Sequence, residues 1–511
     1  MGFIQGLFDA PASDWLKFGG FFVGIFLFIF IAEKARSALG WPAEVNRKLV
    51  HIGTGLLIFF CAFLFESQIP LIWMALIFIM INYLGVRLGR LKGMHGTERH
   101  TYGTVYYPLT FLILVLTCWD HHKVILMLCM LILALADAAA AIVGENIKNP
   151  HEYSLGRDKK SLEGSLTMFL STFLIVWILL PVIGHMDGRT VGWITAAWIG
   201  LLTALFTTAL EALSSGGSDN LTAPLGAAFV LHYMLVHTPP DNLRLSIGMG
   251  LALMTAVLSF KARFLTGSGS VGVFLLASII FGIGGWMWTV PILTFFILSS
   301  LLSKAGKVHK TSFELVFEKS SQRDFCQVLA NGGLAGTFMI CSLYFPNPAW
   351  YPVYLGALAA ATADTWGTEV GVFSKSQPRS ILNLKKVPTG TSGGVSVIGT
   401  LGAFTGASVV VVSGWIFETP YTMHPGNEIL FWIMVFSGVT ASLADSLLGA
   451  TLQARYRCPV CEKLTERHIH CNGRITDHIS GLKWMNNDWV NGFCSAIGAF
   501  LVWIGLQVFV S

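Results

Sequence analysis

Charged residues are scarce in this sequence. Asp, Glu, Lys and Arg make up 12% of the 511 residues, about half of the ~25% that is usual in soluble domains. Hydrophobic residues make up 54%, and the mean hydropathy is +0.65. This composition excludes a disordered chain and a collagen. The apolar runs at 16–32, 49–65 and 166–181 are each about long enough to cross a bilayer, so the sequence predicts an all-α polytopic membrane protein.

A secreted disulfide pattern and a targeting leader are also missing. The first 14 residues carry no basic region before the long apolar run, unlike a cleaved signal peptide, and no Arg- and Ser-rich transit segment is present. Six of the nine cysteines lie in or near apolar segments, where cysteine usually serves as a small apolar filler. These six are Cys61, Cys118, Cys129, Cys326, Cys341 and Cys494. We therefore expect neither a disulfide scaffold nor a cleaved leader.

About 16 hydrophobic segments follow one another along the chain. Their centres lie near residues 24, 57, 77, 111, 133, 174, 202, 230, 251, 276, 295, 336, 361, 405, 440 and 500. The segments at 223–236 and 270–282 are short, which leaves broken or re-entrant helices as an alternative to full spans.

The basic residues predict the orientation of these segments. Of the 33 lysine and arginine residues, 29 fall in one set of alternating loops. These loops cover residues 33–48, 86–103, 144–165, 213–222, 261–269, 303–327, 374–392 and 454–488. The positive-inside rule places this set in the cytoplasm. Both termini are then expected on the other side of a bacterial inner membrane or an organellar membrane.

Two of these loops carry the same pattern, Lys-Lys-x-x-[Glu/Thr]-Gly-[Ser/Thr], which starts at Lys159 and at Lys385. About 22 residues earlier, Asp137 and Asp364 each lie at the end of an apolar run, with a glycine seven residues later. Glu211 and Asp445 lie in later apolar runs, followed by Asp219-Asn220 and Asn486-Asn487-Asp488. The repeat predicts two related halves, 1–240 and 241–511, that join near the turn at 238–241. In this alignment Thr389 takes the place of Glu163.

The repeated acids are functional candidates because a carboxylate within a span is costly. Interfacial exposure or hydrogen bonding between helices is the alternative for any single one of them. Carboxylates bind Mg²⁺, glycine-rich loops expose backbone N–H groups to anions, and lysines neutralise phosphates. Together these parts suit phosphoryl or nucleotidyl transfer. The loop at 389–394 is neither a Walker A loop, because GxxxxGK[ST] is absent, nor a Rossmann fingerprint.

The basic start of the second segment admits two interpretations. Arg47, Lys48 and His51 are expected either to contact phosphate or to set topology as a simple charged flank. In the second half, similar interfacial places are occupied by Lys261, Arg263, Lys304, Lys307, Arg323 and Asn331.

The last long loop contains a cluster of metal-ligand type. Cys458 and Cys461 form a CxxC pair, and His470 and Cys471 follow. This set suits a structural Zn²⁺, although the spacing from Cys461 to Cys471 is shorter than in common two-knuckle sites. Unligated reduced thiols are the alternative. The zinc would brace the loop that delivers Asn487 and Asp488 and would do no chemistry.

At these motifs the sequence resembles two families. Residues 40–235 resemble the polyprenol kinase family, which contains dolichol kinase and phytol kinase and is related to CDP-diacylglycerol synthase. That resemblance rests on RKLVHIG, LADAAAAIVG, GRDKKSLEGS and ALEALSSGGSDNLTAPL. Residues 245–511 look like the membrane family that contains phytyl-phosphate kinase. The motifs there are LTGSGSVGVFLLA, SSLLSKAGK, QVLANGG, ATADTWGTEVG, VPTGTSGGVS, LADSLLGATLQ and NNDWVNG.

The resemblance implies a bifunctional enzyme. The first half would phosphorylate phytol or a related prenol with CTP, and the second would convert phytyl phosphate to phytyl diphosphate. The products would enter tocopherol, phylloquinone or chlorophyll synthesis. The expected partners are the prenol, the prenyl phosphate, a nucleoside triphosphate and the bilayer, with no nucleic acid.

The sequence and the resemblance together assign roles to individual residues. In the first site, Asp137, Glu163, Glu211 and Asp219 would bind or orient Mg²⁺-CTP, and Asp137 would act as general base. The phosphate-binding set there is Arg47, Lys48, His51, Lys159, Lys160, Ser161, Gly164, Ser165 and Asn220. In the second site, the Mg²⁺ set is Asp364, Glu369, Asp445 and Asp488, with Asp364 and Asp445 as catalytic acids. The phosphate-binding set there is Lys304, Asn331, Lys386, Thr389, Gly390, Thr391, Ser392 and Gly393.

Two other functions remain open from the sequence alone. A lipid-phosphate cytidylyltransferase would use the same metal and nucleotide but would release pyrophosphate instead of CDP. A transporter of a lipid or phosphate would also show repeated halves, broken helices and intramembrane acids.

Overall fold

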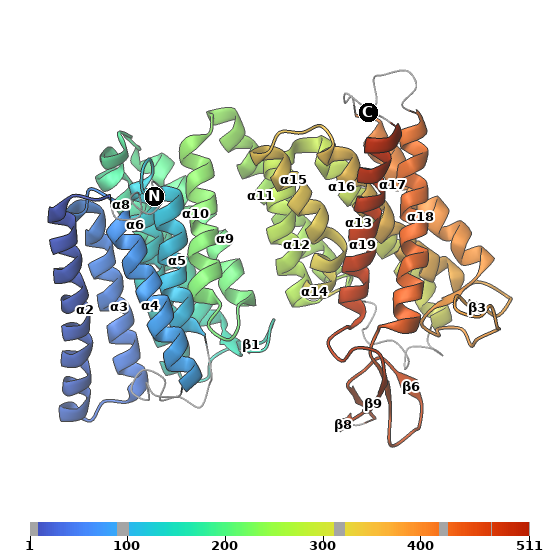
Figure 1. Cartoon of the computed structure of the whole chain (residues 1–511), viewed down its shortest axis with the longest axis horizontal. Coiled ribbons are helices and arrows are strands. Elements are labelled where there is room, and N and C mark those ends of the chain that lie inside the picture. The colour runs from blue at the N-terminus through green and yellow to red at the C-terminus, as the bar shows by residue number, and fades with distance from the viewer. Residues whose placement is uncertain (1–8, 89–101, 311–321, 418–427, 472, 510–511) are drawn as a thin grey trace. The chain divides into compact units, whose positions relative to one another are not determined.

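The computed structural model describes residues 9–88, 102–310, 322–417, 428–471 and 473–509. The chain divides into two compact units, Met1–Asn242 and Leu243–Ser511. Parts of the basic loops at 86–103 and 303–327 lie outside the described residues. Both units are helical, as the low charge and the apolar runs predict (Figure 1).

The first unit is built around one continuous apolar rod. In this rod α6 (Lys123–Leu131) passes through a π turn, η1 (Ile132–Ala136), into α7 (Asp137–Asn146). Every residue from Val124 to Leu131 is buried, because α3, α5, α8 and α10 all pack against α6. The helices around the rod are α2 (Ala12–Leu39), α3 (Ala43–Leu64), α4 (Ile69–Leu88), α5 (Gly103–Cys118), α8 (Leu162–Ile183), α9 (Trp193–Leu213) and α10 (Asp219–Val236). A short 3-10 turn, η2 (Gly184–Asp187), follows α8.

The second unit has its own central helix, α16 (Trp350–Gly371). Thirteen successive residues of α16, 351–363, are buried, and α13, α15, α17, α18 and α19 pack around them. The surrounding elements are α12 (Gly267–Ile279), η3 (Ile280–Gly284), α13 (Gly285–Lys310), α14 (Phe325–Val328), η4 (Leu329–Gly333), α15 (Leu334–Tyr344), α17 (Val397–Trp415), α18 (Glu428–Thr451) and α19 (Asn487–Phe509). Helix α11 (Pro239–Lys261) carries the boundary between the two units.

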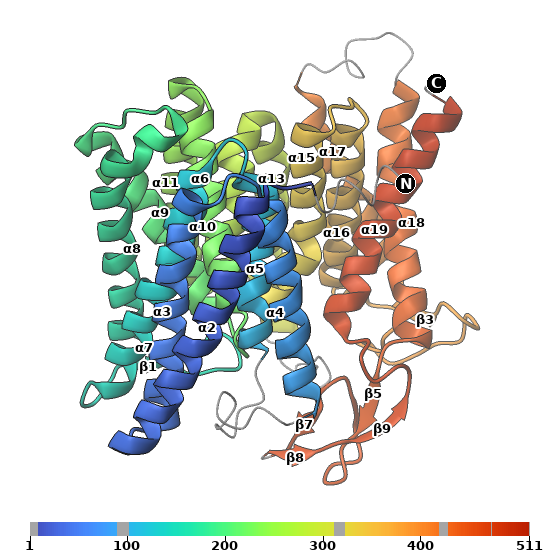
Figure 2. The same cartoon turned by 60° about the vertical axis from the view of Figure 1, so that its left-hand side comes forward.

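Short strands lie outside the helical bundles. Antiparallel pairs join β1 (Glu152–Tyr153) to β2 (Lys160–Ser161) and β3 (Arg379–Ser380) to β4 (Gly394–Val395). Between α18 and α19 the chain forms a sheet in the order β6–β5–β9 and a separate β7–β8 hairpin. These strands are β5 (Arg455–Arg457), β6 (Leu464–Thr465), β7 (Ile469–His470), β8 (Arg474–Ile475) and β9 (Asp477–Ser480). They project beyond the ends of α18 and α19 (Figure 2).

The prediction of a polytopic α-helical membrane protein is confirmed. Among the described residues, 12 helices are long and apolar enough to cross a membrane, and Gly103–Cys118 is a shorter apolar helix. Each of the predicted segment centres falls within a helical stretch. The apolar stretch Gly267–Ala305 is 39 residues long, about twice what a bilayer needs. It divides at Gly285, whose φ of 68° ends the π turn η3 and starts α13.

Candidate active sites

A polar cluster in the first unit is centred on Lys160. Its Nζ donates to the backbone carbonyl oxygen of Glu211 at 2.6 Å and forms an ion pair with the carboxylate of that residue. Asp219 Oδ2 lies 3.6 Å from the same Nζ. The side chains of Lys160 and Glu211 are only 14% and 11% exposed. Desolvation by burial lowers the pKa of Lys160, but the negative charges of Glu211 and Asp219 outweigh it and hold that pKa above its usual value.

The packing of two helices places Lys160 in this cluster. The Ser161 hydroxyl accepts a hydrogen bond from the N–H of Gly164 at 3.1 Å and caps the start of α8. A Cβ at Gly144 on α7 would lie 2.8 Å from that hydroxyl, and one at Gly164 would lie 3.1 Å from the carbonyl oxygen of Ala140. Because both positions are glycine, α7 and α8 approach closely enough for Lys160, one residue before the cap, to meet the end of α9.

His51 and Asp137 form a second polar contact in this unit. His51 Nε2 lies 2.8 Å from the carbonyl oxygen of Leu133 and 3.8 Å from Asp137 Oδ2. A carbonyl oxygen only accepts, so Nε2 carries the hydrogen. Leu133 belongs to the π turn η1, which directly precedes Asp137. Such turns shift the hydrogen-bond register and are frequent at functional sites.

Two hydroxyl groups extend the Lys160 cluster. Ser165 Oγ lies 3.5 Å from Glu211 Oε2 and 2.5 Å from the phenolic oxygen of Tyr153. Burial raises the pKa of Tyr153, which keeps it a neutral hydrogen-bonding group. Glu211 is therefore contacted from β2 and α8, and Tyr153 of β1 joins the cluster through Ser165.

Other expected residues of the first site lie in contacts of their own. Lys159 pairs with Glu152 at 2.9 Å and is 75% exposed. Glu163 pairs with His151 at 2.6 Å. Arg47 pairs with Glu44 at 2.8 Å, and Lys48 pairs with Glu145. Asn220 donates to the carbonyl oxygen of Gly103 at 2.9 Å and links α10 to α5.

The second unit contains a cavity of ≈ 510 Å³. Nine residues that we expected in the second site line it. They are Asn331, Asp364, Glu369, Thr389, Gly390, Thr391, Ser392, Gly393 and Asp445. They come from η4, α16, α18 and the loop before α17, so tertiary packing brings four separate segments to one cavity.

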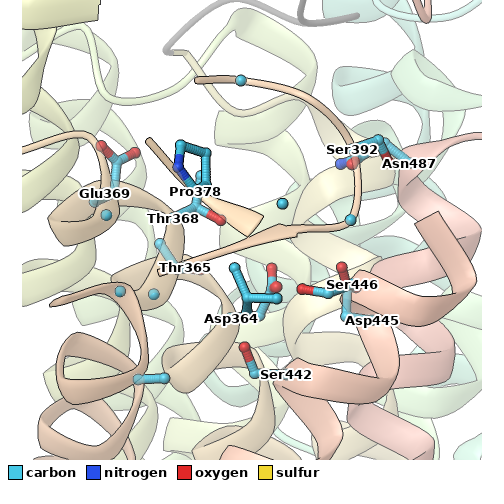
Figure 3. Close-up of a pocket in the computed structure, with 18 of the residues that line it drawn as sticks. Asp364, Thr365, Thr368, Glu369, Pro378, Ser392, Ser442, Asp445, Ser446 and Asn487 are labelled. Carbon is cyan, nitrogen blue, oxygen red and sulfur yellow. The ribbon is translucent and has the colours of Figure 1, made fainter. Parts of the chain in front are cut away.

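The carboxyl groups of Asp364 and Asp445 meet in this cavity. They come from α16 and α18 and hydrogen-bond to each other, with Ser442 and Ser446 beside them (Figure 3). Asp445 Oδ2 is buried, and no described residue donates a hydrogen bond to it. Two facing carboxylates with a buried, uncommitted oxygen fit a hard divalent cation such as Mg²⁺, because such an ion takes oxygen ligands and offsets their mutual repulsion.

The glycine-rich loop at 389–394 lines the same cavity. Gly390 and Gly393 have φ values of 86° and 82°, which L side chains rarely adopt. A Cβ at Gly393 would lie 2.5 Å from that of Ala450 and 2.9 Å from the carbonyl oxygen of Ser446. Ser392 hydrogen-bonds to Gln453 Oε1 at 3.1 Å. The loop leads into α17, so its backbone and a helix N-terminus are both available to an anion.

Two arginines, Arg323 and Arg467, line the cavity besides the residues assigned to the second site. Arg323 lies beside the short helix α14, with its guanidinium group 5.3 Å from the ring centroid of Phe295. Burial lowers the pKa of Arg323 to about 10, and the charge of Glu369 opposes that shift. Arg467 comes from the β5–β9 segment. Both positions lie in loops rich in basic residues, a signal that marks many candidates and selects none.

Three other expected residues of the second site are not among those that line the cavity. Lys304 Nζ lies 5.4 Å from the ring centroid of Phe264. Lys386 is exposed in the β3–β4 loop. Asp488 lies in a cluster with Asp324 and Cys326. One potential ligand atom from each of these three residues lies within 4.8 Å of the other two.

The structure corrects the alignment of the two Lys-Lys loops. In both units the acid is followed seven residues later by a glycine, and that glycine packs near a serine cap and a second glycine. These partners are Ser161 and Gly164 for Gly144, and Ser396 and Gly399 for Gly371. The counterpart of Glu163 at the helix start is therefore Ile398, and the expected match with Thr389 is wrong. The error arose because the longer loop before α17 contains its own Gly-Thr pair.

The four expected zinc ligands come together in the second unit. One potential ligand atom from each of Cys458, Cys461, His470 and Cys471 lies within 4.8 Å of every other. Of the six cysteines expected to be apolar fillers, five are buried or half-buried in helices. The expectation is wrong for Cys326, which is exposed on α14.

An apolar hollow of ≈ 450 Å³ lies between α2 and α3 of the first unit. It is lined by Gly20, Phe21, Gly24, Phe28, Gly53, Leu56, Leu57 and Phe60. His51 faces the rod that carries Asp137, whereas Gly53 faces Phe28 on α2. At 100° per residue these positions lie on different sides of α3, so the hollow does not open onto the His51–Asp137 contact.

Comparisons with known proteins agree with the membrane architecture. Residues 250–499 match the family described as integral membrane protein DUF92. Protein PGR of Arabidopsis thaliana is 30% identical over 277 residues, which cover 50% of this chain and 94% of that protein. A phytol kinase of Synechocystis is 34% identical over 194 residues, covering 37% of this chain and 78% of the relative. Protein VTE6, chloroplastic, of Arabidopsis thaliana is 22% identical over 307 residues, covering 58% and 83%. No solved structure matches. The chain belongs to the DUF92 family of integral membrane proteins.

Proposed function

We propose that this protein is a bifunctional isoprenoid kinase. Its first unit transfers a phosphoryl group from CTP to phytol or a related prenol, and its second unit adds a phosphoryl group to the resulting prenyl phosphate. The similarity to phytol kinases supports the acceptor class. The repeated arrangement of acid, glycine and serine cap supports two sites of common design in two related halves.

In the first unit the prenol hydroxyl attacks the γ-phosphorus of CTP. A new O–P bond forms, the bond to the β-phosphate oxygen breaks, CDP leaves, and Asp137 takes the hydroxyl proton. His51 Nε2 lies 3.8 Å from that carboxylate. Lys160 faces the phosphates, and Glu211 and Asp219 would hold Mg²⁺, which would neutralise charge on the transferring group.

In the second unit the acceptor is already an anion and needs no general base. Asp364 and Asp445 would hold Mg²⁺ here. The 389–393 loop and Arg323 face the same cavity and would bind the phosphates of the nucleotide and the prenyl phosphate. Backbone N–H groups and a guanidinium group suit such charge because they donate in fixed directions.

The observation that carries the proposal is the 510 Å³ cavity, where two facing carboxylates, a glycine-rich loop and a half-buried arginine converge. A cation site next to an anion site is what phosphoryl transfer requires. Transporters of the broken-helix type place their sites at helix breaks near the membrane midplane; this cavity instead includes residues of the extramembrane β5–β9 segment.

The test is to incubate the purified full chain with phytol, CTP and Mg²⁺ and to identify the products by mass. We expect phytyl phosphate, then phytyl diphosphate, with CDP formed in step. Release of pyrophosphate with a CDP-linked lipid would indicate a cytidylyltransferase instead. Replacing phytol with farnesol, geranylgeraniol or a longer polyprenol measures chain-length preference, and replacing CTP with ATP measures nucleotide preference.

A further inference from the structure

The segment between α18 and α19 has little apolar core of its own. Its strands are two to four residues long, and every residue of β8 and β9 is exposed. Among its described residues, the large buried hydrophobic side chains are Tyr456 and Met485, and Tyr456 lies between the rings of His468 and His478. Hairpins this short are marginal in water unless something else ties them together.

Four side chains with metal-binding atoms lie at the centre of this segment. Cys461 Sγ lies 3.6 Å and Cys471 Sγ 3.2 Å from His470 Nδ1. Zinc bonds of about 2.3 Å to sulfur and 2.0–2.1 Å to nitrogen, at tetrahedral angles, place ligand atoms about 3.6–3.8 Å apart. The separations of 3.2 and 3.6 Å in the structure are close to that spacing, and all four atoms lie within 4.8 Å of one another.

The backbone is shaped to present these atoms. The chain turns from β5 to β6 through Cys458-Pro-Val-Cys461, where the N–H of Glu462 bonds to the carbonyl oxygen of Cys458 at 2.9 Å. The N–H groups of Val460 and Cys461 donate hydrogen bonds to Cys458 Sγ. Two such donors favour the thiolate form of a cysteine side chain. Glu462 and Cys471 have positive φ values of 57° and 37°. Such conformations cost energy in non-glycine residues and persist where the surroundings require them.

We propose that Cys458, Cys461, His470 and Cys471 bind one Zn²⁺, and that this site holds Glu466 and Arg467 in the wall of the cavity. Three thiolates and one imidazole in a closed set of four are typical of structural zinc. Glu466 and Arg467 lie between the two ligand pairs in the chain and line the cavity. The hydroxyl of Thr476 donates to the carbonyl oxygen of Arg467 at 2.8 Å and ties the β7–β8 hairpin to that wall.

The base of the segment is joined to the cavity independently of the metal. Gln453 accepts a hydrogen bond from Ser392, and the N–H of Leu482 bonds to the carbonyl oxygen of Leu452 at 2.8 Å. Loss of zinc is therefore expected to release residues 455–480 and leave α18 and α19 in place. This separation makes the effect of the metal measurable without global unfolding.

The first experiment uses the full chain purified without chelator. Its zinc content is measured by elemental mass spectrometry, and the accessibility of its thiols is measured by alkylation. We expect about one zinc per chain, and Cys458→Ser and Cys471→Ser each to lower it at least tenfold. The matched control is Cys341→Ser, a half-buried cysteine of α15 outside the cluster; it should keep its zinc. A wild-type chain with no zinc and four freely alkylated or disulfide-bonded side chains would overturn the proposal.

The second experiment tests the bracing role, which rests on the proposed function. Limited proteolysis should cut Cys458→Ser within 455–480 at least ten times faster than wild type, with unchanged helical melting. The same variant should raise KM in the prenyl-phosphate reaction and leave the prenol reaction unchanged. Zinc and protease protection without either kinase activity would contradict the kinase assignment and leave the metal site standing. Equal proteolysis of variant and wild type would overturn the bracing role.

Discussion

Lys160 donates to both the backbone carbonyl oxygen and the carboxylate of Glu211, 51 residues away, whereas its neighbour Lys159 pairs with Glu152 at the surface. Lys159 directly precedes β2, and successive side chains of an extended chain point to opposite faces. One therefore enters the bundle and the other remains in water. This contrast provides a matched pair for mutagenesis.

Lys160→Met should abolish prenol phosphorylation and destabilise the first unit. Removing one member of a buried ion pair leaves the other charge without a partner, which costs about 3–5 kcal/mol. Thermal unfolding of the purified protein and a phytol phosphorylation assay measure the two effects. Lys159→Met should change neither, because an exposed pair contributes about 0–1 kcal/mol. Equal effects of the two substitutions would contradict the assigned role of Lys160.

The two proposed sites should fail separately. Asp137→Asn should abolish phosphorylation of phytol and leave phosphorylation of supplied phytyl phosphate intact, because only the alcohol needs a base. Asp445→Asn should do the reverse, since it removes a carboxylate from the second cavity. Product analysis with each substrate supplied alone measures both. Loss of both activities in either variant, with folding retained, would exclude two independent sites.

Gly393→Ala should weaken phosphate binding in the second unit. Alanine at a φ of 82° costs about 1–2 kcal/mol, and its Cβ would lie 2.5 Å from that of Ala450, so the loop must move. We expect KM for nucleotide or prenyl phosphate to rise at least tenfold. Gly188→Ala is the control, because Gly188 has a φ of 69° with nothing within 4 Å of the added Cβ. An unchanged KM in Gly393→Ala would argue against the loop as an anion site.

Arg323→Met should stabilise the free protein and weaken binding of the phosphate ligand. Desolvation disfavours the charged guanidinium group, as its lowered pKa shows, and methionine has no charge to desolvate. The free energy of unfolding at pH 7 measures the change in stability, and the KM for prenyl phosphate measures the change in ligand binding. The exposed Arg157→Met should leave both unchanged. A less stable Arg323→Met with normal KM would mean that the guanidinium group is structural.

The same arginine predicts a dependence on pH. The pKa of Arg323 is lowered to about 10 from 12.5 because burial disfavours its charged form. The folded state therefore binds this proton more weakly than the unfolded state. Below pH 10 the guanidinium group is charged in both states, so the full destabilisation is present there. Above pH 10 the stability of the wild type should rise relative to that of Arg323→Met. Denaturant titrations from pH 8 to 11 measure the difference, and a constant difference would contradict the burial effect.

Local patterns in the sequence predicted much of the fold and part of the candidate sites. Apolar runs marked the helices because a bilayer requires them, and acids stood out within those runs because they are costly there. Asp364 and Asp445 were paired correctly as neighbours for that reason. The alignment of the two Lys-Lys loops failed because short Gly-Ser/Thr patterns recur by chance, whereas the cap of α17 depends on the helix packed against it.

The sequence by itself determined the membrane class, the segment centres and the residue types of the Cys458–Cys471 cluster, since these depend on composition and short spacing. Only the tertiary structure decided that Lys160 meets Glu211, that Arg323 lines the cavity, and that Arg467 reaches it from the segment between α18 and α19. Those relationships join segments many residues apart in the chain. Helix packing creates them through close approach at glycines such as Gly144 and Gly399, and no local pattern records which distant side chain will lie opposite.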